Sequence, residues 1–156
     1  MIHSTLGFIH TASALLAMLT GALVIVNPKM GTLHKRLGYG YVVSMLLLNS
    51  TAFQIYHLFG HFGPFHVLAI MSLICVLGGI IPALARQHVR NWLHWHYYFM
   101  TWSVVGLYAA FWAELFTRTL PMGQFWPVVL GATGVTSWLG SYFIRKHAAR
   151  LLASAK

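Results

Sequence analysis

Long apolar runs alternate with short polar or turn-forming segments along this chain of 156 residues. Five runs, at residues 6–26, 33–58, 64–84, 92–117 and 125–144, each have about the 20 residues that a helix needs to cross ~30 Å of hydrocarbon. Asn27 and Pro28 end the first run, Thr32 is the predicted N-cap of the second, and Pro64 suits the first turn of the third. The pattern therefore predicts five membrane-spanning helices.

The connections between these runs are short, so consecutive helices should pack as antiparallel neighbours. We expect an all-α integral membrane fold, an up-and-down four-helix transmembrane bundle plus a fifth spanning helix. The sequence shows no internal repeat and no linker, which predicts a single domain over residues 1–156.

Composition agrees with a bilayer environment and changes how the charge is interpreted. The chain is 58% hydrophobic and 7% charged, whereas a soluble domain has roughly 25% charged residues. Its formal net charge of +9 could indicate nucleic acid, but the apolar spans interrupt the basic residues, so we expect the lipid bilayer as partner and no nucleic acid. In the five-helix topology Arg118 stands alone on one side. The other nine basic residues share the opposite side, which the positive-inside rule makes cytoplasmic, with the N-terminus outside: Lys29, Lys35, Arg36, Arg86, Arg90, Arg145, Lys146, Arg150 and Lys156.

Histidines inside or at the rims of the spans are the main candidates for function, because ionisable groups are costly in lipid. Helical phase places His10 and His66 in an outer layer, and His34 and His96 in an inner layer. His96 is favoured over its neighbour His94 because it shares a helix face with Glu114. Opposed imidazoles from diagonal helices suit the two axial positions of haem b. The sequence therefore predicts His10/His66 and His34/His96 as cofactor-binding pairs in an electron-transfer protein.

Other chemistries remain open at the same residues. His10, His57, His66 and Glu114 could converge on Zn, Cu or non-haem Fe, since imidazole and carboxylate suit these metals. Glu114 and Arg118 are four residues apart and could form an ion pair. Alternatively, Glu114 could be a buried protonatable acid in a proton-linked transporter.

A cofactor-free role is the further alternative. The span at residues 125–144 contains several glycines and no ionisable group, which is typical of a helix that packs against a partner or a second copy. This favours a non-enzymatic membrane subunit or assembly factor. Cys75 lies within an apolar run and is interpreted as a buried thiol. No nucleophile with a base and an orienting acid is evident, so no catalytic residue is predicted.

The segment Gly31-Thr32-Leu33-His34-Lys35-Arg36-Leu37-Gly38-Tyr39-Gly40-Tyr41-Val42 resembles the bacterial predicted-membrane-protein family called domain of unknown function 2306. His10 ahead of a stripe of small residues, Phe65-His66, and His96 with Met100 are similar too, and together they span residues 9–118. The resemblance implies a multi-spanning bundle in a bacterial inner membrane, with His10, His34, His66 and His96 as the positions of interest, and it implies no reaction. The architecture also resembles small diheme cytochrome b bundles, for which a membrane redox partner or quinone is expected.

Overall fold

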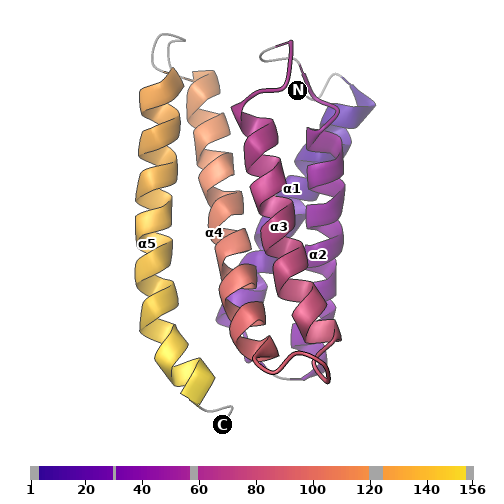
Figure 1. Cartoon of the computed structure of the whole chain (residues 1–156). Helices are drawn as coiled ribbons and strands as arrows, with labels where there is room; N and C mark the ends of the chain where they lie inside the picture. The colour runs from indigo at the N-terminus through magenta and orange to yellow at the C-terminus, as the bar shows by residue number, and fades with distance from the viewer. Residues whose placement is uncertain (1–3, 30, 57–59, 120–124, 154–156) are drawn as a thin grey trace. The chain divides into compact units, whose positions relative to one another are not determined.

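The computed structural model describes residues 4–29, 31–56, 60–119 and 125–153, and these residues are helical with short connections. The described residues form five helices, drawn in Figure 1, and no strand occurs in these ranges. The all-α prediction is confirmed. The helices are α1 (Thr5–Val26), α2 (Thr32–Ala52), α3 (Pro64–Leu84), α4 (Trp92–Thr119) and α5 (Phe125–Ala153).

The second helix is shorter than its apolar run. The run continues to residue 58, but α2 ends at Ala52, and residues 57–59 lie outside the described chain. Beyond the helix, the Gln54 and Ile55 amides bond the carbonyls of Thr51 and Ala52 at 3.0 and 3.2 Å, three residues back. This tighter 3₁₀-type bonding closes the helix despite the apolar side chains that follow. The start also differs: Gly31, with φ 101°, is the N-cap, and Thr32 is the first helical residue.

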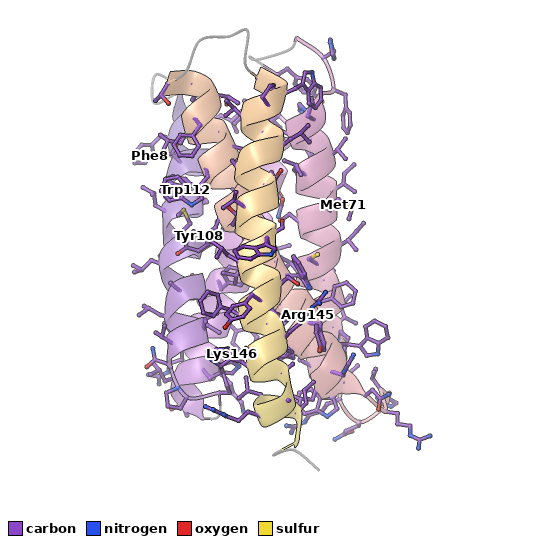
Figure 2. The ribbon with its side chains drawn as sticks, turned by 90° about the vertical axis from the view of Figure 1, so that its left-hand side faces the viewer. Phe8, Met71, Tyr108, Trp112, Arg145 and Lys146 are labelled. Atoms are coloured by element: carbon purple, nitrogen blue, oxygen red, sulfur yellow. The ribbon has the colours of Figure 1, made fainter. Side chains whose placement is uncertain are left out.

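The fifth helix is longer than predicted. It continues from residue 144 to Ala153, through the exposed residues Arg145 and Lys146 (Figure 2). Lysine, arginine and alanine are good helix formers, and cations near a helix C-terminus interact favourably with the helix dipole. The Lys146 ammonium also lies 5.7 Å from the centre of the Tyr142 ring. A basic tail therefore extends the helix beyond its apolar part.

Three of the described helices, α1, α3 and α4, are long and apolar enough to cross a membrane. The apolar part of α2 is preceded by Lys35 and Arg36, and α5 ends in a basic stretch. Membrane crossing by α2 and α5 stays a prediction. Apolar side chains such as Phe8, Met71 and Trp112 are 59%, 54% and 39% exposed (Figure 2), as expected for helices surrounded by lipid tails.

The chain forms two compact units, Met1–Val76 and Leu77–Lys156, which divide within α3. In the first unit α1 and α2 lie side by side (Figure 1). Ala17 on α1 is fully buried, and Tyr41 and Met45 on α2 are 1% exposed. Ala17 belongs to the stripe of small residues that follows His10 along α1. An interhelical hydrogen bond from Asn49 to Ser72, 3.2 Å long, joins α2 to α3.

In the second unit α4 and α5 lie side by side (Figure 1), and glycines allow close approach. A Cβ built on Gly140 of α5 would lie 2.4 Å from Cγ2 of Val105 on α4, which is too short for any contact. The Tyr97 hydroxyl donates to the Ile144 carbonyl at 2.8 Å across the same pair. Small residues and interhelical hydrogen bonds are the usual means of helix association in membranes.

Polar side chains close α1 at its C-terminal end. The Asn27 side-chain amide donates to the Leu23 carbonyl at 2.8 Å, and the Lys29 ammonium donates to the carbonyls of Val24 and Ile25. A cation here satisfies carbonyls that have no partner within the helix. Burial lowers the pKa of Lys29 from its usual value.

Candidate functional site

His10 on α1 is half-buried and bonds a neighbouring helix of the first unit. Its Nδ1 lies 3.0 Å from Oγ1 of Thr51 on α2. The Thr51 hydroxyl donates its own proton to the carbonyls of Leu47 and Leu48, both at 2.9 Å. Thr51 is therefore the acceptor in its bond to histidine, and Nδ1 of His10 carries a proton. In a neutral imidazole the other nitrogen, Nε2, then has the lone pair.

His66 is the most buried of the predicted site residues that the structure describes, with 5% of its surface exposed. It lies in the first turn of α3, where its Nδ1 accepts a 3.1 Å hydrogen bond from the backbone N–H of Gly63. The residue thus takes the part that glutamate or glutamine has in a capping box. Its ring stacks on those of Tyr56 and Phe62, with centroid distances of 4.7 and 4.9 Å.

The hydrogen bond to Gly63 fixes the proton of His66 on the opposite nitrogen from that of His10. Because Nδ1 accepts, the neutral ring carries its proton on Nε2. That nitrogen is buried and has no hydrogen-bond partner among the described residues. A buried unsatisfied donor costs roughly 1–3 kcal/mol. A protonated Nε2 has no lone pair, so it cannot coordinate a metal in this arrangement.

His96 on α4 is half-buried, and its Nδ1 lies 2.9 Å from the Gly79 carbonyl oxygen of α3. A carbonyl only accepts, so Nδ1 donates and Nε2 has the lone pair. This is the arrangement that orients most metal-binding histidines, whose second nitrogen donates to a carbonyl or carboxylate. His94, two residues earlier, is exposed, which confirms the preference for His96 that helical phase predicts.

Glycine at position 79 allows this contact. A Cβ built there would lie 2.6 Å from Cγ and Sδ of Met100 and 3.1 Å from its backbone nitrogen. A neighbouring Cβ on Gly78 would lie 3.0 Å from the Phe99 ring. The two glycines let α4 approach the backbone of α3 closely enough for His96 to reach a main-chain carbonyl.

The two other predicted histidines are less informative. His34 is half-buried in the first turn of α2, beside the exposed Lys35 and Arg36. His57 lies outside the described residues. The pairing of His34 with His96 therefore stays a prediction, as does that of His10 with His66.

Glu114 and Arg118 form the ion pair that their spacing predicts. Oε1 of Glu114 lies 2.6 Å from Nη2 of Arg118, and the two side chains are 30% and 42% exposed. The described residues include no group of three or more histidine, cysteine, aspartate or glutamate side chains that could hold a metal ion. The four-ligand set of His10, His57, His66 and Glu114 includes one residue outside the described ranges and stays a prediction.

The hydrogen-bond partners of the histidines are residues that the sequence did not reveal. Thr51, Gly63 and Gly79 each decide which nitrogen of a histidine carries the proton. The capping position of His66 could have been found, since it lies three residues after a glycine and two after Pro64. The other two partners come from different helices and leave no local signal.

A family model described as "Predicted membrane protein (DUF2306)" matches residues 7–146. The chain belongs to this family. The match extends beyond residues 9–118, on which the resemblance rests, and includes most of α5, so the expectation that the fifth helix lies outside it is wrong. Comparison with curated proteins and with solved structures gives no match. The protein is thus a member of a membrane-protein family defined without a reaction.

Proposed function

We propose that this family member is a bacterial inner-membrane electron-transfer protein that binds haem b, or another metal, through histidines on its transmembrane helices. The observation that carries the proposal is the 2.9 Å bond from Nδ1 of His96 to the Gly79 carbonyl. It orients the ring and leaves the lone pair on Nε2, within a helix apolar enough to span a membrane.

The described histidines differ in how well they fit haem. His96 and His10 fit, because each donates through Nδ1 and has its lone pair on Nε2. His66 does not fit as it stands, because its Nε2 bears the proton. Haem, when bound, would supply one-electron chemistry. The protein's part is to orient the ligand nitrogen, through Gly79 for His96 and through Thr51 for His10.

The charge distribution supports the proposed orientation. Within the first unit Lys29, Lys35 and Arg36 lie at the connection between α1 and α2, and within the second unit Arg86 and Arg90 lie between α3 and α4. Under the positive-inside rule these connections face the cytoplasm, so the N-terminus is outside. Fusion of a reporter enzyme that is active only in the cytoplasm to the C-terminus should give full activity.

The test of haem binding is a reduced-minus-oxidised absorption spectrum of the full chain, purified in detergent after expression with ample haem. We expect a Soret band in the wild type and its loss in His96→Ala. His94→Ala is the matched control, since it removes an exposed histidine two residues away, and it should retain the band. Variants of His10 and His34 then identify the second ligand. A wild type with no Soret band and no bound iron, copper or zinc would refute the proposal.

The second candidate is a cofactor-free membrane subunit or assembly factor, and one observation on α5 favours it. A Cβ built on Gly131 or Gly134 meets no atom within 4 Å, and Val135 and Trp138 nearby are 62% and 70% exposed. An open glycine face in a membrane helix suits close packing against another helix. Gly134→Leu should then abolish a complex seen by native electrophoresis of gently solubilised membranes. The transporter alternative has less support, because the carboxylate of Glu114 is paired with Arg118.

A further inference from the structure

We infer that His66 is the donor of a binding site for a neutral carbonyl oxygen on a bilayer-soluble molecule, such as a quinone. The inference does not rest on haem binding, since the site would exist in a protein that holds no metal. It starts from one buried atom. Nε2 of His66 bears the proton, because Nδ1 accepts from Gly63, and no described residue accepts that proton.

The surroundings of His66 favour a neutral acceptor over an anionic one. The lysine and arginine residues of the unit Met1–Val76 are Lys29, Lys35 and Arg36, all at the connection between α1 and α2. The His66 ring stacks on Tyr56, which follows the C-terminal end of α2. The 16 residues from Arg36 to Ala52 correspond to about 24 Å of helix, so His66 lies far from the three cations. A phosphate or carboxylate at His66 would therefore have no nearby lysine or arginine in this unit. A carbonyl needs none.

The rings around His66 suit a ligand that arrives from the bilayer. Tyr56 and Phe62 both stack on the His66 ring, with interplanar angles of 28° and 30°, and these contacts hold the ring and fix the direction of its Nε2 edge. These two covering side chains are 44% and 52% exposed. These two rings thus lie at the molecular surface, where a lipid-soluble molecule in the bilayer can contact them directly.

Quinones and the ester groups of phospholipids both offer such a carbonyl, and the experiment separates them. The full chain, labelled with ¹⁵N-histidine, is placed in vesicles of ether-linked phosphatidylcholine, which has no ester carbonyl. Decylubiquinone is then added, and the Nε2–H signal of His66 is followed by NMR. In a parallel sample ester-linked phosphatidylcholine replaces the ether lipid.

Two substitutions separate the observed hydrogen bond of His66, from Gly63, from the inferred bond to the ligand. Asparagine places its side-chain oxygen near the position of Nδ1, so His66→Asn keeps the acceptor for Gly63 and removes the donor. Glutamine places its amide nitrogen near the position of Nε2, so His66→Gln keeps the donor and removes the cap. The first should weaken ligand binding about threefold to tenfold, the value of one hydrogen bond, and the second should retain it.

A shift of the Nε2–H signal on addition of decylubiquinone supports the quinone form of the site. A shift between ether and ester lipid without quinone assigns the site to lipid carbonyls and also supports the inference. If the signal moves in neither comparison, the inference is wrong, and this result needs no variant to fold. Equal binding by wild type and a folded His66→Asn would also overturn it.

Discussion

His66 in the first unit and His96 in the second are both histidines of apolar helices, and they differ in the direction of one hydrogen bond. At His66, Nδ1 accepts from the Gly63 N–H, whereas at His96, Nδ1 donates to the Gly79 carbonyl. The proton therefore lies on Nε2 in one ring and on Nδ1 in the other. One residue presents a donor and the other a lone pair.

The difference shows that residue type alone does not define a ligand. From the sequence, the two histidines fill equivalent axial positions in two layers. The backbone group that each ring meets makes them chemically distinct, since an amide can only donate and a carbonyl can only accept. Two histidines of one chain can thus differ in role, one suited to bind haem iron and the other to donate a hydrogen bond to a carbonyl.

The largest expected contrast is the position of the proton, which is all or none. ¹⁵N NMR of histidine-labelled protein at a pH where the rings are neutral should show the Nε2–H form for His66 and the Nδ1–H form for His96. Assignment uses His66→Asn and His96→Ala, each of which removes one set of signals. The same tautomer at both residues would contradict the difference inferred between His66 and His96.

Substitution at Gly79 should break the second site. Gly79→Val places a branched side chain where a Cβ already lies 2.6 Å from Met100, and overpacking of this kind costs about 1–3 kcal/mol. It should also separate His96 from its carbonyl acceptor. Thermal denaturation in detergent, followed by circular dichroism, measures the loss. Gly106→Val is the control, because a Cβ at Gly106 meets no atom within 4 Å; equal loss in both variants would contradict the packing argument.

Removal of the acceptor for His10 tests the first unit. Thr51→Val keeps the shape of the side chain but leaves the Nδ1 proton of His10 without its 3.0 Å partner, and the expected cost is about 1–2 kcal/mol. Thr133→Val is a matched control, since the Thr133 hydroxyl bonds carbonyls of its own helix. The same denaturation assay compares the two variants. A smaller effect at Thr51 than at Thr133 would show that the interhelical bond adds nothing.

The smallest effect is expected for the ion pair on α4. Glu114→Gln should reduce the free energy of unfolding by only about 0.3–0.5 kcal/mol, because an exposed pair four residues apart on a helix is weak. The difference should decrease further at high salt. A loss above about 1 kcal/mol, or a change in a pH-linked flux in proteoliposomes, would instead favour a functional acid at this position.

Local sequence patterns were sufficient to predict the positions of the helices and to predict that His96, rather than His94, is the more buried histidine. Apolar runs located all five helices. Residues two apart on a helix point about 200° apart, and this distinguished the exposed His94 from the half-buried His96. The predicted C-terminal ends of α2 and α5 were wrong for physical reasons. Hydrogen bonds of the 3₁₀ type end α2 within an apolar stretch, and basic residues extend α5. Apolar patterning reports burial in lipid, which is not the same as helical backbone geometry.

The sequence by itself determined the membrane class, the positions of the helices, the family and the set of histidines. Only the tertiary structure decided what those histidines can do. The partner of His10 is 41 residues away in the sequence and that of His96 is 17 residues away, on another helix in each case. Which nitrogen keeps its lone pair depends on whether the contacting group donates or accepts, and that contact exists only once the helices have packed.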